Sequence, residues 1–141
     1  MATIRRTLLI EAPVGGVYTL ARSFEQLPAF VPGVVAATGD AMEARIPAGG
    51  RTLACRFLLE EAVEGASLRF ATEGEAPERI EATFVPVLGD ATWSTWTLEF
   101  PCLDAKEAAP VQAAIARAVS DALTAFRDEA ERRAHAARGE A

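Results

Sequence analysis

The segment over residues 11–35, EAPVGGVYTLARSFEQLPAFVPGVV, constrains the fold of this 141-residue chain most strongly. It predicts the end of a strand, a helix with Pro13 in its first turn, a short second helix over 24–31 and a turn at Pro32 and Gly33. Short strands and one long alanine-rich helix follow. Two helices after the first strand, with a last helix closing the chain, suit a curved sheet wrapped around a helix. A sheet that curves around a helix in this way can enclose a cavity.

The first two helices are short and imperfect. Apolar side chains fall at helical spacing in the first, at Val14, Val17, Tyr18 and Ala21. Gly15 and Gly16 are unfavourable there, because each costs about 1 kcal/mol relative to alanine. Ser23 is a candidate cap for the second helix, in which Pro28 predicts an irregular course.

From residue 34 onward the pattern changes to strands and turns. Turn residues stand at 39–40, 49–50, 64–65, 74–77 and 89–90. Between them we expect strands over 34–38, 42–48, 51–62, 67–72, 79–87 and 92–100, after a first strand over 3–11. Connections of hairpin length predict an antiparallel meander.

Apolar residues alternate along these strands and recur with helical period in the last element. The helix is expected to begin near Asp104 or Ala105 and to pack its stripe on the sheet; the stripe includes Ile115, Ala118, Val119, Ala122, Leu123 and Phe126. Beyond Phe126 the stripe gives way to charges, so residues 128–141 are expected to project or fray. The whole chain, 1–141, is interpreted as one α+β domain.

Composition excludes several classes of function. The chain carries 20 acidic and 14 basic residues, a net charge of −6, so it lacks the basic footprint of a nucleic-acid binder. No apolar run approaches the roughly 20 residues of a membrane span, which argues against stable membrane insertion. The N-terminal apolar run is too short for a secretory signal, so we expect a cytoplasmic protein. In that compartment Cys55 and Cys102 are expected to be reduced thiols.

The order strand, two helices, six strands and long helix resembles the helix-grip fold. The chain is similar to the START-like, Bet v 1-like superfamily (SRPBCC) in its bacterial polyketide cyclase/dehydrase branch. The motifs that carry the resemblance are Ala12-Pro13, Val17-Tyr18, Phe24-Glu25, Leu27-Pro28 with Phe30, Pro32-Gly33-Val34 and the turn Gly89-Asp90-Ala91-Thr92. The chain departs from the family pattern at Gly15-Gly16 and at Trp93.

The resemblance implies a curved antiparallel sheet of about seven strands around the last helix, with an apolar cavity between them that holds a hydrophobic small molecule. The expected lining is Tyr18, Phe30, Cys55, Phe57, Leu68, Phe70, Thr72, Phe84, Ser94, Trp96, Leu98, Ile115, Ala118, Val119 and Ala122. The alternative is that these residues simply fill a core. Alanines on the helix favour a cavity, yet they also permit close helix-to-sheet packing.

Catalytic chemistry finds little support in the sequence. The only histidine, His135, lies in the charged tail, which leaves no Ser-His-Asp or Cys-His arrangement and no histidine-based metal site. Gly15-Gly16 lacks the Gly-x-Gly-x-x-Gly pattern of dinucleotide sites, and we expect no cofactor. Glutamates between 60 and 81 favour a solvated rim. Glu61 is the exception, because strand alternation predicts that it shares the inner face.

Three functions therefore remain open. The first is non-catalytic binding or carriage of a lipid, quinone or polyketide-like molecule. The second is a polyketide cyclase or dehydratase, with Glu61, Tyr18, Arg45 and Arg56 as candidates, although both arginines fall on the outward parity. The third is a protein-interaction module, for which Trp93 and Leu58 on the outer face mark a candidate patch for a homodimer or another partner.

Overall fold

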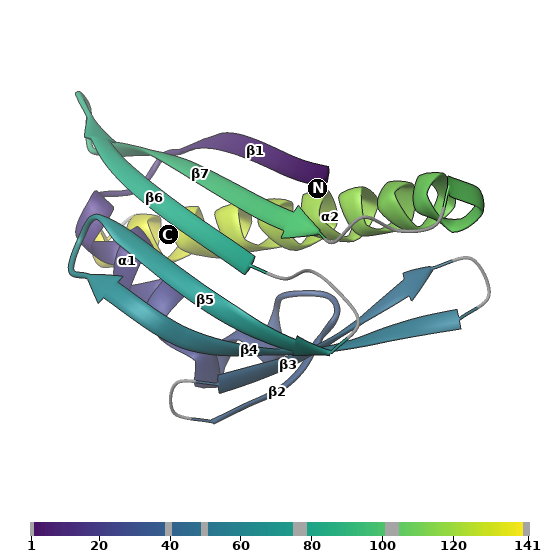
Figure 1. Cartoon of the computed structure of the whole chain (residues 1–141). Helices are drawn as coiled ribbons and strands as arrows, with labels where there is room; N and C mark the ends of the chain where they lie inside the picture. Colours follow the sequence, from purple (N-terminus) through teal and green to yellow (C-terminus); the bar gives the residue numbers. More distant parts are fainter. Residues whose placement is uncertain (1, 39–40, 49–50, 75–78, 101–104, 140–141) are drawn as a thin grey trace.

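The computed structural model describes residues 2–38, 41–48, 51–74, 79–100 and 105–139. In this part of the chain seven strands form one antiparallel sheet of order β1-β7-β6-β5-β4-β3-β2. The sheet curves around the long helix α2, which lies across one of its faces (Figure 1). The elements in chain order are β1 (Ala2–Ile10), α1 (Val14–Arg22), the 3-10 helix η1 (Phe24–Ala29), β2 (Val34–Thr38), β3 (Ala41–Ala48), β4 (Arg51–Val63), β5 (Ser67–Gly74), β6 (Arg79–Val87), β7 (Ala91–Phe100) and α2 (Ala105–Ala137).

The expected helix-grip architecture is confirmed. Strands that follow one another in the sequence pair as a meander from β2 to β7. The first strand, β1, pairs with β7 along its whole length, from Ala2 opposite Phe100 to Ile10 opposite Thr92. The predicted turns at 39–40 and 49–50 lie outside the described residues, as do 75–77, Asp104 and Cys102. Among the described helices, none is long and apolar enough to cross a membrane.

A register shift in β4 corrects one expectation. Leu59 pairs with Phe70, but the next pair is Glu61 with Arg69, so β4 carries an extra residue between them. A bulge of this kind reverses the side-chain alternation that follows it. Glu61 therefore lies on the outer face, where its carboxylate binds the Arg69 guanidinium. The alternation of the sequence had placed it on the inner face.

Ser23 ends α1 rather than capping η1. Its hydroxyl donates a 2.6 Å hydrogen bond to the carbonyl of Thr19, and no side-chain bond from Ser23 reaches the start of η1. The predicted second helix is present as a 3-10 helix with Pro28 inside it. Its irregular course agrees with the missing N–H of that proline.

The last helix does not fray at residue 128. It continues to Ala137, and Ala130 is only 5 % exposed. Arg133 explains part of this order, because its guanidinium lies over the Phe30 ring and donates to the Gln26 side chain of η1 at 2.6 Å. On the other flank, the Glu131 carboxylate accepts the backbone N–H of Glu11 at 2.8 Å. The charged C-terminal end of α2 is therefore held against the N-terminal part of the chain by these contacts.

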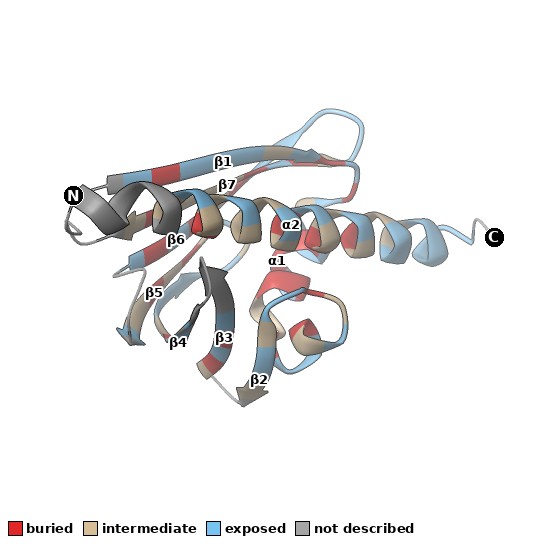
Figure 2. Cartoon of the chain, turned by 90° about the vertical axis from the view of Figure 1, so that its right-hand side faces the viewer, coloured by how far each residue is buried: buried red, intermediate tan, exposed pale blue. Residues whose placement is uncertain are grey.

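The core fills the end of the molecule at which α1 packs between the sheet and α2. Buried residues gather on α1 and on the sheet-facing side of α2 (Figure 2). Phe24 of η1 lies against Phe70, with ring centroids 5.4 Å apart. A chain of edge-to-face contacts then runs across the interior, from Tyr18 to Phe84, to Trp96 and to Phe126.

Candidate functional site

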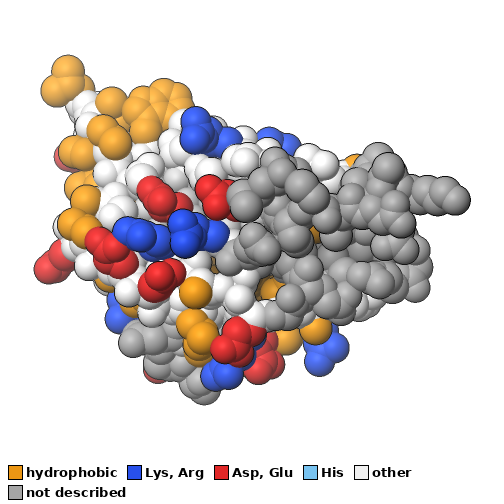
Figure 3. Space-filling model, in the orientation of Figure 1, with side chains coloured by type: hydrophobic (Ala, Val, Ile, Leu, Met, Phe, Trp, Pro, Cys, Tyr) orange, Lys and Arg blue, Asp and Glu red, His pale blue; other side chains and the backbone are white. Residues whose placement is uncertain are grey.

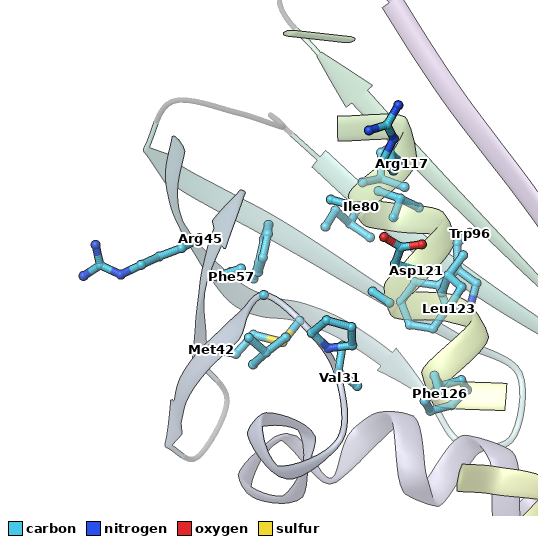
Figure 4. Close-up of a pocket in the computed structure, with 18 of the residues that line it drawn as sticks. Val31, Met42, Arg45, Phe57, Ile80, Trp96, Arg117, Asp121, Leu123 and Phe126 are labelled. Carbon is cyan, nitrogen blue, oxygen red and sulfur yellow. The ribbon is translucent and has the colours of Figure 1, made fainter. Parts of the chain in front are cut away.

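A cavity of about 660 Å³ lies between α2, the sheet and the segment that joins η1 to β2. Figure 4 shows its side chains converging from these elements. The lining residues are Val31, Pro32, Gly33, Val34, Met42, Ala44, Arg45, Phe57, Ile80, Trp96, Leu98, Ala114, Arg117, Ala118, Val119, Asp121, Ala122, Leu123 and Phe126. All but three of these are apolar or glycine, so the chamber suits an apolar guest.

Three alanines explain why the helix leaves room here. Ala114, Ala118 and Ala122 follow one another at intervals of four residues, so their methyl groups form a row along one side of α2. Across the cavity stand the larger side chains of Phe57 and Ile80. An alanine methyl group is too short to reach these side chains, whereas a leucine side chain would fill the gap. The space between the helix and the sheet therefore remains open.

Another wall of the cavity is formed by residues 31–34. This segment is fixed to β3 because the Gly33 carbonyl accepts the backbone N–H of Arg45 at 2.8 Å. Gly33 has φ +90°, and a Cβ added there would lie 3.3 Å from the Arg45 carbonyl oxygen. Both the positive φ and the close approach favour glycine at this position. The Pro32-Gly33 turn thus sets one edge of the cavity.

Two fully buried hydroxyl side chains, those of Thr92 and Ser94, are already hydrogen-bonded. Trp96 lines the cavity, and its indole N–H donates a 2.7 Å hydrogen bond to Oγ of Ser94, which is fully buried. The buried hydroxyl of Thr92 donates to the Ala12 carbonyl at 2.8 Å. The charged lining residues Arg45, Arg117 and Asp121 are all exposed, and the Arg45 side chain points away from the cavity (Figure 4).

The residues expected from the sequence divide into two groups. Six of them line the cavity together, namely Phe57, Trp96, Leu98, Ala118, Val119 and Ala122. The others lie outside its lining, either buried in the core (Tyr18, Cys55, Leu68, Phe70, Phe84, Ser94 and Ile115) or half-buried (Phe30 and Thr72). Contact of any of these side chains with a ligand stays a prediction.

Sequence reasoning missed the wall formed by 31–34 and the contribution of β3. Met42 and Ala44 alternate on the inner face of that strand, and this spacing was a usable signal. Leu123 and Phe126 belong to the apolar stripe predicted for the last helix but were not assigned to the site, and Ile80 of β6 was not singled out for it. The wall at 31–34 has no periodicity, so no pattern in the sequence could assign it.

The side chains considered for catalysis do not meet in the cavity. Arg56 faces outward, 3.8 Å from the Glu73 carboxylate on the neighbouring strand, and Glu61 is on the same outer face. Tyr18 packs edge-on against Phe84. His135 is exposed near the end of α2. Within the described residues, no group of three or more His, Cys, Asp or Glu is placed to hold a metal ion.

The outer face of the sheet carries a second apolar feature near the β6–β7 hairpin. Trp93 is 42 % exposed and lies between Leu9 of β1 and Val85 of β6 in the strand register. Figure 3 shows hydrophobic side chains gathered at this corner, beside a charged band on the middle of the face. Leu58, which we had grouped with Trp93, is half-buried in β4.

Residues 1–131 match the family model described as polyketide cyclase / dehydrase and lipid transport. Among solved structures, the Zhui aromatase/cyclase from Streptomyces sp. R1128 is 15 % identical, with 96 % of this chain and 97 % of that chain covered and a TM-score of 0.65. A START superfamily protein from Mycobacterium smegmatis is 13 % identical, with 94 % and 97 % covered and a TM-score of 0.61. The Aha1 dimer from Colwellia psychrerythraea is 14 % identical, with 93 % and 97 % covered and a TM-score of 0.68. No curated protein matches the chain significantly.

Proposed function

Because the chain belongs to the polyketide cyclase / dehydrase and lipid transport family, we propose that it binds and carries a hydrophobic small molecule beneath α2. The observation that carries this proposal is the cavity itself. Its volume of about 660 Å³ falls within the range of roughly 300–1,000 Å³ that small-molecule sites occupy. Its lining is almost wholly apolar, so burial of a guest's apolar surface supplies the driving force.

Carriage is favoured over catalysis by the position of the polar groups. A general acid or base must reach the reacting atom within hydrogen-bond distance. The charged lining residues Arg117 and Asp121 are exposed to water, and the buried Ser94 hydroxyl is occupied by Trp96. At 15 % identity, the likeness to an aromatase/cyclase supports the fold and adds no catalytic residue to this chain. A cyclase or dehydratase activity is therefore the second candidate.

Two measurements on the purified protein test the proposal. Mass spectrometry of a gentle organic extract should find a co-purified lipid, quinone or related apolar molecule in stoichiometric amount. Titration with a hydrophobic fluorescent dye should show saturable binding with micromolar affinity, and the extracted molecule should displace the dye. If the extract is empty and the dye does not bind, carriage is contradicted.

We also propose that the protein forms a homodimer and is located in the cytoplasm. Trp93 and its apolar neighbours Leu9 and Val85 support a contact between copies at the outer face, away from the cavity. Light scattering of the wild-type protein and of Trp93→Thr checks this. A dimer that the substitution converts to a monomer supports the contact, and a wild-type monomer at high concentration contradicts it.

A further inference from the structure

Among the described residues that line the cavity, the charged side chains near the ligand space gather on α2 (Figure 4). Of the three charged lining residues, Arg45 points away, while Arg117 and Asp121 lie four residues apart on α2 at the mouth (Figure 4). Elsewhere in the described lining, the indole N–H of Trp96 already has a partner, Oγ of Ser94. A polar group of a ligand buried there would lose its water without gaining a matching hydrogen bond, which is unfavourable. The ligand therefore enters with its apolar part first.

The helix geometry decides which charge faces the ligand. At 100° per residue, Asp121 lies about 60° around the helix from Ala118, the centre of the alanine row, and Arg117 lies about 100° from it. The carboxylate is thus the nearer charge. No hydrogen bond or ion pair to the described residues engages either side chain. An arginine four residues before an aspartate is also the less favourable order for an ion pair on a helix.

We propose that the ligand is an amphiphile whose exposed end is a hydrogen-bond donor, neutral or cationic, held at the mouth by Asp121. This inference rests on the proposed function and names the class of molecule that the same cavity takes. A carboxylate or phosphate end would meet the Asp121 charge, within a protein whose net charge is −6. A hydroxyl or ammonium group would instead donate to the carboxylate at the rim.

The test uses three probes that share one twelve-carbon chain, namely dodecylammonium, dodecan-1-ol and dodecanoate. Each displaces a hydrophobic dye from the wild-type protein, below the concentration at which the probe forms micelles. Dodecylammonium and dodecan-1-ol should bind about threefold more tightly than dodecanoate, because a contact with an exposed charge changes affinity only modestly. The difference should shrink as salt concentration rises.

Two substitutions separate a local effect from a change in total charge. Asp121→Asn should abolish the preference. Asp128→Asn removes the same charge from the same helix, at a residue that is exposed and outside the cavity lining, and should preserve the preference.

The outcomes distinguish this inference from the proposed function. If dodecanoate binds as tightly as the other probes, or if the preference survives Asp121→Asn, the inference is overturned while carriage stands. If Asp128→Asn abolishes the preference equally, the effect comes from net charge and the inference is again overturned. If neither the dye nor any probe binds, the proposed function itself fails.

Discussion

The indole N–H of Trp96 donates a 2.7 Å hydrogen bond to Oγ of Ser94, two residues earlier on the same face of β7. This bond satisfies Nε1, which is the only polar atom of the Trp96 side chain. The rings of Phe84 and Phe126 each make an edge-to-face contact with the indole. The wall is consequently apolar although it contains a tryptophan.

Ser94→Ala should lower the free energy of unfolding by about 1–3 kcal/mol, because it leaves a part-buried N–H without its acceptor. Urea unfolding measures the change. Ser67→Ala makes the same substitution on the outer face of β5 and should cost less than about 0.5 kcal/mol. In a Trp96→Phe background the donor is absent, so Ser94→Ala should then cost clearly less. Equal costs in both backgrounds would show that the hydrogen bond does not stabilise the wall.

Gly33→Ala should destabilise the protein by about 1–2 kcal/mol, since alanine at φ +90° is strained and its Cβ would press on the Arg45 carbonyl. It should also weaken dye binding, because the wall at 31–34 would shift. Gly16→Ala is the matched control. It lies inside α1 with nothing near the added methyl, and it should stabilise by about 1 kcal/mol. Loss of stability in both variants would contradict this account of the turn.

Glu129 makes the end of α2 sensitive to acid. The Arg132 guanidinium, hydrogen-bonded to Glu129, holds the pKa of that carboxyl below its usual range with help from Arg133, although burial opposes the shift. A carboxyl with a lowered pKa in the folded state stabilises the fold above its unfolded-state pKa. That contribution disappears as the pH falls through the folded-state pKa.

Glu129→Gln should therefore lower the melting temperature at neutral pH, and the difference from wild type should vanish in acid. Thermal unfolding followed by circular dichroism across this pH range measures it. At neutral pH, Asp128→Asn at the exposed neighbouring position should change the melting temperature little. A Glu129→Gln deficit that persists unchanged in acid would contradict the ion-pair explanation.

Much of the fold could be predicted because its signals are local. Alternation along the strands and the period of the α2 stripe follow from two repeat lengths, and these placed Phe57, Leu98 and Ala118 correctly on facing surfaces. The face on which Glu61 lies could not be predicted correctly, because one extra residue in β4 reverses the alternation without a signal in the sequence. Bulges depend on how two strands pair, which the order of residues in one strand does not specify.

Local sequence patterns also could not predict which inner residues line the cavity and which are buried in the core. Phe70 and Trp96 both lie on inner strand faces, yet Phe24 covers the first while the second borders open space. Which inner positions are covered depends on where α1 and η1 pack against the sheet. That position is set by the tertiary fold. The persistence of α2 to Ala137 has the same origin, because Arg133 finds Phe30 and Gln26 only after folding.

The central claim is that the space beside the alanine row of α2 holds an apolar ligand. Ala118→Trp places a large side chain in that space, whereas Ala113→Trp adds the same group at an exposed position of the same helix. Both variants should unfold cooperatively, which thermal unfolding verifies, and Ala122→Leu provides a milder cavity-filling change.

Titration of the hydrophobic dye into these proteins is the most direct measurement. The wild-type protein and Ala113→Trp should bind with the same micromolar affinity. Ala118→Trp should bind at least about tenfold more weakly, a loss of about 1.4 kcal/mol, with Ala122→Leu in between. Equal dye affinity in folded Ala118→Trp and wild-type protein would contradict the account, because the ligand would then occupy some other place.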